Sequence, residues 1–424
     1  MQQIGLADLP AGKISGACAQ GWEPLLEAFI ENFRKRGEVG ASFCVRIGGR
    51  PVIDVWGGTA DLRTGEQWSA DTLSVVFSAT KGATALCAHL LAARGLLDLD
   101  APVARYWPEF AANGKEHATV AMMLDHSVGV PGFREPLKDC AYADWEYMIR
   151  RLEQEPAFWQ PGTRSGYHML TFGWTVGEIV RRVSGKSLGR FFQDEIARPL
   201  GLDFWIGLPE ALEHRVCPIL PHTPGPDDPP PELMTYIMTH PGSDPFNVFV
   251  NTGGYIPSLT DPETGRSVVD TKLAHSAEIG AGGGITNARG LAGLYAPLAN
   301  GGGALWSPED IWRMSQTASA TGCDATLRVP TRFSLGFMKA LDNRHRHSGD
   351  TASLIIGDRA FGHVGMGGSL GFADPDCRLS FGYTMNRMGP GIFLDERAQS
   401  LVDATYRKLG YASDRAGCWT RDAA

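Results

Sequence analysis

The sequence lacks several features that would point directly to a function. Its eight cysteines, at positions 18, 44, 87, 140, 217, 323, 377 and 418, form no Cys-x-x-Cys pair. It has no uncharged apolar run long enough to span a bilayer. It has no basic patch with interleaved aromatic residues, and its formal net charge is −8. These absences argue against a structural zinc site, a membrane protein and a nucleic-acid partner.

A secretory signal is also missing from the first residues, because no basic segment there is followed by an apolar core. A chain of 424 residues with dispersed cysteines and no signal is typical of a cytoplasmic protein with reduced thiols. The sequence indicates no cofactor and no metal ion. Its length and its 43% hydrophobic content allow two or three domains with sizeable cores.

Strand-like and helix-like patterns divide the chain into three parts. Alternating or continuous apolar runs predict strands near both ends, over residues 41–47, 51–56, 333–338, 361–364, 371–373 and 379–385. Apolar residues at helical spacing predict helices over residues 22–36, 78–94, 172–184, 188–196, 287–299 and 395–408. Between them, residues 218–270 are rich in proline and read as a long loop segment.

This order predicts an α/β domain assembled from both chain ends, with an all-α domain inserted between its halves. The expected boundaries are 1–75 plus 275–424 for the α/β domain and 76–274 for the helical domain. An active site is expected in the cleft between the two domains.

One short run carries most of the chemical information. Ser78 and Lys81 are three residues apart, where an extended apolar stretch gives way to a helical pattern. Residues i and i+3 share a helix face, so the hydroxyl and the amine can form a hydrogen bond. A serine becomes a nucleophile when a base takes its proton, and a lysine with a lowered pKa can be that base. Many Ser-x-x-Lys runs, however, are only a helix serine beside an exposed lysine.

Two further elements are compatible with such a site. Tyr167 follows a Pro-Gly turn, and a tyrosine can move protons between a nucleophile and a leaving group, or simply line a cleft wall. Residues 362–369, Gly-His-Val-Gly-Met-Gly-Gly-Ser, join a short strand to a glycine-rich turn. Such a turn lets a substrate approach backbone N–H groups closely, although it can also be only a bulged strand end.

Taken together, these elements resemble the serine β-lactamase and penicillin-binding fold. That family carries Ser-x-x-Lys, then a tyrosine or serine element, then Lys-Thr-Gly or His-x-Gly on an edge strand. Here the order is Ser78 and Lys81, then Tyr167, then His363 and Gly365. The resemblance implies an antiparallel sheet flanked by helices.

The likeness extends over roughly residues 20–410 and is strongest to the β-lactamase-like carboxylesterases called family VIII. Residues 124–131, 170–208 and 283–289 are similar to stretches of that branch. It implies that Ser78 is the acylated nucleophile and that Lys81 takes or relays its proton. Tyr167 would act as general base in acylation and as proton donor to the leaving alcohol. The backbone N–H groups of Ser78 and Met366 would form the oxyanion hole.

Two departures from the family pattern bear on the substrate. Met169 stands where penicillin-recognising enzymes have an asparagine, and His363, followed two residues later by Gly365, stands where they often have a lysine. Both changes favour a small or medium uncharged acyl ester over a penicillin. Phe246 and Phe249, in the proline-rich segment, are further candidates to bind the substrate.

The alternatives are a β-lactamase, a D-amino peptidase, or an amide hydrolase or acyltransferase that uses the same serine. A non-catalytic assembly protein of the same fold is a third possibility. Ser369 lies in a Gly-x-Ser-x-Gly run typical of α/β-hydrolases, but no histidine follows it to complete that triad in order.

Overall fold

A central antiparallel sheet joins the two ends of the chain. The computed structural model describes residues 1–3, 7–9, 12–223, 225, 231–255, 266–346 and 352–421. Its largest sheet has nine strands in the order β1-β3-β5-β4-β14-β13-β12, with β2 beside β3 and β6 beside β5. The strands are β1 (Gln2–Gln3), β2 (Ala7–Leu9), β3 (Gly12–Cys18), β4 (Gly40–Ile47), β5 (Arg50–Asp61), β6 (Glu66–Gln67), β12 (Phe361–Val364), β13 (Leu370–Asp374) and β14 (Leu379–Met385).

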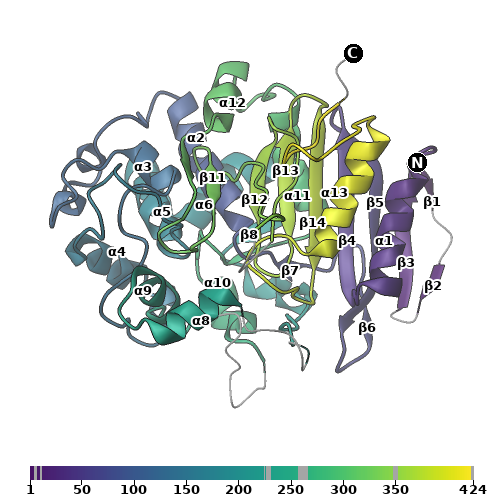
Figure 1. Cartoon of the computed structure of the whole chain (residues 1–424), viewed down its shortest axis with the longest axis horizontal. Coiled ribbons are helices and arrows are strands. Elements are labelled where there is room, and N and C mark those ends of the chain that lie inside the picture. Colours follow the sequence, from purple (N-terminus) through teal and green to yellow (C-terminus); the bar gives the residue numbers. More distant parts are fainter. Residues whose placement is uncertain are drawn as a thin grey trace.

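The two chain ends meet where β4 pairs with β14, with Phe43 opposite Tyr383. The sheet built from both termini, expected from the sequence, is therefore confirmed. Figure 1 shows the purple N-terminal strands and the yellow-green C-terminal strands side by side in this sheet.

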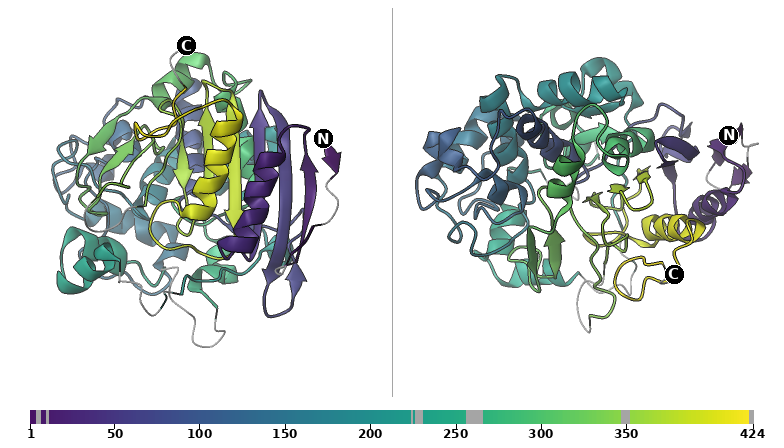
Figure 2. Two further views of the ribbon diagram at one scale, coloured as in Figure 1. Left: turned by 45° about the vertical axis from the view of Figure 1, so that its right-hand side comes forward. Right: turned by 90° about the horizontal axis from the view of Figure 1, so that it is seen from above.

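Helices cover both faces of the sheet because its strands alternate their side chains. On β13, Gly371 faces Tyr295 of α11 (Ala288–Ala299), where a Cβ would lie only 2.7 Å from the ring. The next residue, Phe372, stacks on Tyr406 of α13 (Glu396–Lys408). Helix α1 (Glu23–Lys35) packs beside α13 on that second face (Figure 2).

The middle of the chain forms a mostly helical half, on the left in Figure 1. It contains α2 (Thr80–Ala93), α3 (Val120–Leu124), α4 (Trp145–Gln154), α5 (Thr171–Ser184), α6 (Leu188–Phe192) and α7 (Arg198–Leu200). Helix α2 packs against α5 and is buried over most of its length. Lys81, in the first turn of this helix, is thus held in the protein core.

A second, three-stranded sheet ties the helical half to the chain ends. Strand β9 (Gly284–Thr286) lies between β7 (Ser74–Val75) and β8 (Phe204–Ile206). The inserted segment therefore contains one short strand in addition to its helices. The division into domains at residues 75 and 275 stays a prediction.

Two local expectations were wrong. The segment expected to be loop contains α8 (Glu232–Thr239) and α9 (Asp244–Val250), and α10 (Lys272–Ser276) follows it. Helix α9 begins with Ser243 as its N-cap and a proline in its first turn, both of which favour a helix start.

The strand expected over residues 333–338 is also wrong over most of its length, because the observed strand shares only Phe333 with it. Strand β11 (Thr331–Phe333), paired with β10 (Ser319–Thr321), ends before Gly336. The φ angle of Gly336 is +92°, which extended backbone does not allow, so the chain turns there. Helix α12 (Pro308–Ser315) precedes this pair of strands.

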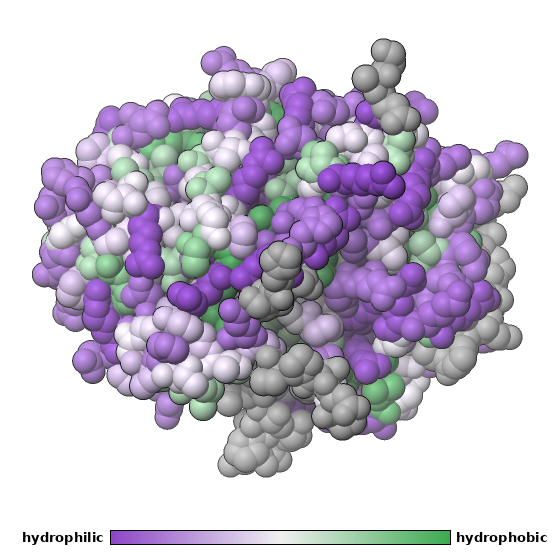
Figure 3. All heavy atoms as spheres, in the orientation of Figure 1, coloured by the Kyte–Doolittle hydropathy of each residue, from purple (hydrophilic) through white to green (hydrophobic). Residues whose placement is uncertain are grey.

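Polar and charged side chains dominate the face seen in Figure 3, and apolar atoms are visible in a recess near its centre. Among the described residues, no helix is both long enough and apolar enough to cross a bilayer.

Candidate active site

Ser78 lies at the junction between β7 and α2, where hydrogen bonds to neighbouring residues fix the backbone. Val76 N–H donates to Gly284 O at 2.9 Å, which ties the junction to β9. Thr80 Oγ1 donates to the carbonyl of Phe77 and accepts from Gly284 N–H at 2.8 Å. Phe77 has a φ of +44°, a conformation that costs a bulky residue about 1–3 kcal/mol. The surrounding contacts hold this strained turn, which presents the partly exposed Ser78 at the start of the helix.

Lys81 points from the first turn of α2 toward Ser78. Its Nζ lies 3.1 Å from Ser78 Oγ, 2.7 Å from Met169 O and 2.9 Å from Ala281 O. The lysine is fully buried, and this desolvation lowers its pKa well below the usual value. A neutral amine has two N–H donors and one lone pair. When the two carbonyls accept the N–H groups, the lone pair is left for the Ser78 hydroxyl.

Tyr167 packs over the same pair. Lys81 Nζ lies 4.7 Å from the centroid of its ring, and the ring stacks on Phe333 at 5.9 Å. Burial raises the pKa of Tyr167, and its hydrogen bond with Ser78 acts in the opposite direction. The phenol therefore keeps its proton at neutral pH and is placed to share it with the serine oxygen.

Three buried histidines surround this group without adding charge. His126 lies 4.9 Å from the Tyr167 ring and His363 lies 6.1 Å from it, measured between ring centroids. Burial lowers the pKa of His168 to about 3 and that of His363 to about 3, and lowers that of His126 as well. All three are therefore neutral at pH 7. The site combines an amine of lowered pKa, a protonated phenol and neutral imidazoles in a buried environment.

Ser78 and Tyr167 open into a narrow pocket of about 30 Å³. On the usual measure this is room for roughly two water-sized groups. The pocket is walled by apolar side chains from distant segments: Met169, Phe249, Leu327, Met338, Val364, Met366, Ile392 and Phe393. None of its lining residues carries a formal charge.

The structure brings some of the sequence-predicted substrate residues to this pocket and leaves others outside it. Met169, Phe249 and Met366 line it. Phe246, also on α9, packs against the neighbouring core instead. The His363 side chain is outside the lining, and its Nδ1 lies 2.7 Å from Val364 O.

Gly365 contributes through its backbone. A Cβ at this position would lie 2.2 Å from Val76 O, so only glycine lets the end of β12 approach the strand before Ser78. This approach brings Met366 to the pocket. Within the described residues, the N–H groups of Ser78 and Met366 have no hydrogen-bond partner. Two free donors at one pocket are what an oxyanion hole requires.

Sequence reasoning missed five lining residues: Leu327, Met338, Val364, Ile392 and Phe393. Val364 could have been predicted, because it stands inside the His-x-Gly run. Met338 stands at the end of the strand expected over residues 333–338, but the structure places it after the turn at Gly336. Leu327, Ile392 and Phe393 lie outside the named helices and strands, where no periodicity marks a buried side chain.

Ser369, the serine of the Gly-x-Ser-x-Gly run, is fully buried, and its Oγ has no hydrogen-bond partner among the described residues. It contacts neither a base nor the pocket that Ser78 opens into, so it is a structural residue of the glycine turn.

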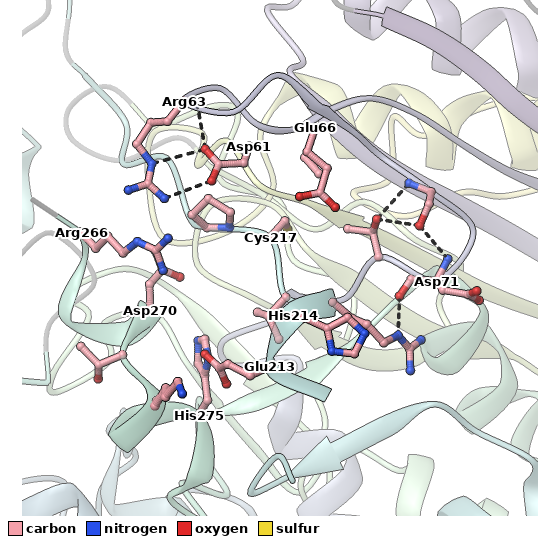
Figure 4. Close-up of a pocket in the computed structure, with 18 of the residues that line it drawn as sticks. Asp61, Arg63, Glu66, Asp71, Glu213, His214, Cys217, Arg266, Asp270 and His275 are labelled. Carbon is pink, nitrogen blue, oxygen red and sulfur yellow. Dashed lines mark hydrogen bonds and ion pairs between the residues drawn. The ribbon is translucent and has the colours of Figure 1, made fainter. Parts of the chain in front are cut away.

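A larger cavity, of about 1000 Å³, shares no lining residue with the Ser78 pocket. Its walls are strongly charged (Figure 4): Arg63 pairs with Asp61 and Lys272 with Glu210, and His275 Nδ1 lies 2.8 Å from Glu213 Oε1. The serine in its wall, Ser69, is hydrogen-bonded to Thr72. This cavity therefore lacks a serine activated by a base.

Comparison with known proteins agrees with the geometry. The Beta-lactamase family profile matches residues 26–405. The chain is 33% identical over 395 residues to the esterase/β-lactamase LipL of Mycobacterium tuberculosis. This alignment covers 91% of this chain and 86% of LipL.

Solved structures show the same likeness. A family VIII carboxylesterase is 37% identical, with a TM-score of 0.80 over 93% of this chain and 99% of its own. A penicillin-binding protein homologue from Caulobacter crescentus is 32% identical, with a TM-score of 0.78 over 93% of this chain and 99% of its own. The family match spans most of the sequence, and this chain belongs to the Beta-lactamase family.

Proposed function

We propose that this protein is a serine carboxylesterase that forms an acyl-enzyme on Ser78. The observation that carries the proposal is the 3.1 Å distance between Ser78 Oγ and the buried Lys81 amine, with the Tyr167 ring 4.7 Å from that amine and in the same pocket as Ser78. The esterase relatives and the family VIII structure support the same chemistry.

Acylation begins when Ser78 Oγ attacks the ester carbonyl and the lone pair of Lys81 accepts the serine proton. The N–H groups of Ser78 and Met366 stabilise the negative oxygen of the tetrahedral intermediate. When the C–O bond of the ester breaks, Tyr167 donates its proton to the departing alcohol and regains one from Lys81. The phenol proton thus leaves with the alcohol, the serine proton replaces it on Tyr167 by way of Lys81, and the acyl group stays on Ser78.

Deacylation runs through the same groups in reverse. A water molecule attacks the acyl carbonyl, loses a proton to the Lys81 and Tyr167 pair, and releases the acid as Ser78 Oγ is reprotonated. This division of roles makes Lys81 the base for the serine, because burial lowers the pKa of its amine, and Tyr167 the acid, because burial raises the pKa of its phenol.

The pocket favours uncharged esters with a small acyl group. Its walls are apolar and its volume is small, so a short alkyl chain fits and loses its water favourably. A penicillin carries a carboxylate, and none of the lining residues offers a cation to pair with it. Hydrolysis of β-lactams or amides by the same serine is the second candidate function, which the LipL relative supports.

The test is covalent labelling. Incubation with a phosphonate ester or a sulfonyl fluoride should add one adduct mass to the intact protein, on the peptide containing Ser78. Ser78→Ala should take up no label and lose ester hydrolysis while its thermal unfolding stays close to wild type. Labelling elsewhere, or wild-type rates in Ser78→Ala, would overturn the proposal. Turnover of a chromogenic cephalosporin measured beside a nitrophenyl acetate then ranks the two candidate functions.

The eight cysteines support a cytoplasmic location for this activity. All of them are free thiols, including the exposed Cys140 and Cys323, as in proteins of reducing compartments.

A further inference from the structure

A buried carboxylate lies directly behind Tyr167. Asp324 is fully buried. Its two oxygens lie 3.0 and 3.1 Å from Tyr167 N, and the backbone N–H groups of Thr326 and Leu327 donate to Oδ1 at 2.9 and 3.0 Å. The Thr331 hydroxyl donates to Oδ2 at 3.1 Å. A carboxylate held by several uncharged donors and no cation is costly to bury, so its presence calls for an explanation.

These bonds connect the segment that carries Tyr167 to the loop of residues 324–331. The Thr326 hydroxyl lies 2.9 Å from both Asp324 Oδ1 and Tyr167 O, so the loop holds the tyrosine backbone through its N–H and its carbonyl. Ala325 N–H donates to Ser165 O at 3.1 Å, two residues before the tyrosine. The backbone of Tyr167 is therefore fixed from one side by a single loop.

The same loop forms part of the pocket wall. Leu327, whose N–H is held by Asp324, lines the pocket together with Ser78 and Tyr167. One carboxylate thus sets the position of the phenol and of an apolar wall that faces the acyl group. The negative charge of Asp324 also raises the pKa of Tyr167.

We infer that Asp324 is a positioning residue for the reaction: its hydrogen bonds to Tyr167 and to residues 326–327 hold the phenol in register with Ser78. The inference rests on the proposed esterase function. It follows that loss of Asp324 impairs mainly the step in which Tyr167 donates a proton.

The primary variant is Asp324→Asn, which removes the charge and places an N–H₂ group against donors. Asp374→Asn is the matched control, because Asp374 is also buried and accepts from Tyr406 at 2.8 Å, and it does not line the Ser78 pocket. For an ethyl ester, a poor leaving group, we expect kcat to fall about 10–100-fold in Asp324→Asn and less than 3-fold in Asp374→Asn. For a nitrophenyl ester, which needs little proton donation, the Asp324→Asn loss should be several-fold smaller.

A double mutant separates positioning from general damage. If Asp324 acts through the phenol, Asp324→Asn should cost less than 3-fold when it is added to Tyr167→Phe. The inference would be overturned if the fold-losses in kcat of the two single variants multiplied in the double variant. It would also be overturned if Asp324→Asn lowered kcat equally for the ethyl and the nitrophenyl ester.

Isosteric variants cover the case in which Asp324→Asn does not fold. Thr326→Val removes the hydroxyl that touches both Asp324 and Tyr167, whereas Thr331→Val removes one that touches only Asp324. We expect the leaving-group effect in Thr326→Val and less than a 2-fold change in Thr331→Val. Equal effects of the two variants would overturn the inference. If instead Ser78→Ala and Tyr167→Phe keep full activity, it is the proposed function that fails.

Discussion

Lys81 Nζ lies 3.1 Å from Ser78 Oγ, and its other two partners are the backbone carbonyls of Met169 and Ala281. Backbone carbonyls satisfy the N–H groups of the amine without supplying a negative charge that would hold a third proton. Burial then makes the neutral amine the favoured form. This arrangement is the reason for proposing Lys81 as the base that accepts the Ser78 proton. It predicts that the rate of ester hydrolysis depends on pH.

Ester hydrolysis should fall at acid pH as Lys81 becomes protonated, with a midpoint well below the usual lysine pKa. Lys81→Met should lower kcat/KM by about 10³-fold or more, because a positioned base typically contributes 10²–10⁴-fold. The check is a pH–rate profile of kcat/KM for a nitrophenyl ester, since free-enzyme pKa values govern that quantity. A flat profile between about pH 5 and 9 would contradict the role of the amine.

The free energy of unfolding should also depend on pH through the lowered pKa of Lys81. The pKa of Lys81 is lower in the folded protein than in the unfolded chain, so the unfolded chain binds more protons between those two values. Its contribution therefore disfavours folding below the unfolded pKa of about 10.4, and this penalty fades as the pH rises. The free energy of unfolding of wild type minus that of Lys81→Met should rise by up to about 1.4 kcal/mol per pH unit within that range. Urea unfolding at pH 7.5 and pH 9.5 measures it, and a difference that stays constant would mean that Lys81 is charged in the fold.

Tyr167→Phe should lower kcat, and the loss should be larger for esters whose leaving alcohol is more basic. The ring packing on Phe333 survives this change, so the variant should fold normally. For an ethyl ester we expect a loss of about 10²–10⁴-fold, and for a nitrophenyl ester a much smaller one. Steady-state rates on a series of alcohols give the dependence, and equal losses across the series would exclude Tyr167 as the proton donor.

Phe249→Ala should shift the preferred acyl chain to a longer one, because this side chain walls the pocket. One methylene in an apolar pocket is worth about 10–200-fold. We therefore expect the ratio of kcat/KM for hexanoate to that for acetate to rise at least 10-fold. Phe246→Ala is the control on the same helix, because its ring lies outside the pocket lining. The same shift in both variants would mean that α9 moves as a whole and that the wall was misassigned.

Met169→Asn should raise β-lactam acylation relative to ester acylation. The Met169 side chain lines the pocket, while its carbonyl holds Lys81, so a side-chain change leaves the amine contact in place. An amide there can donate to the acylamino oxygen of a penicillin. Acylation rates for a chromogenic cephalosporin and a nitrophenyl ester give the ratio, and an unchanged ratio would show that the missing amide does not limit the activity.

Two kinds of signal predicted parts of the site from the sequence: local spacing and a family resemblance. Ser78 and Lys81 are one helical turn apart, so local spacing alone places them together. Tyr167 and Met366 came from a family resemblance in chain order, and the fold brings both to the serine.

Asp324 had no comparable signal. Its partner Tyr167 is far away in sequence, and an aspartate near a threonine is common in turns. The pocket wall at Leu327 and Ile392 depends on loop conformations, which long-range packing decides. By contrast, the start of α9 could have been predicted, because Ser243 and Pro245 are standard helix-start residues.

The pairing of β4 with β14 has a consequence for biosynthesis. Ser78 and Lys81 belong to the early part of the chain, whereas Met366 lies between two strands that reach the sheet only through β14. In the proposed mechanism, a nascent chain that ends before β14 therefore has the nucleophile but not a complete oxyanion hole. We expect reactivity toward esters to arise only after the C-terminal strands have docked.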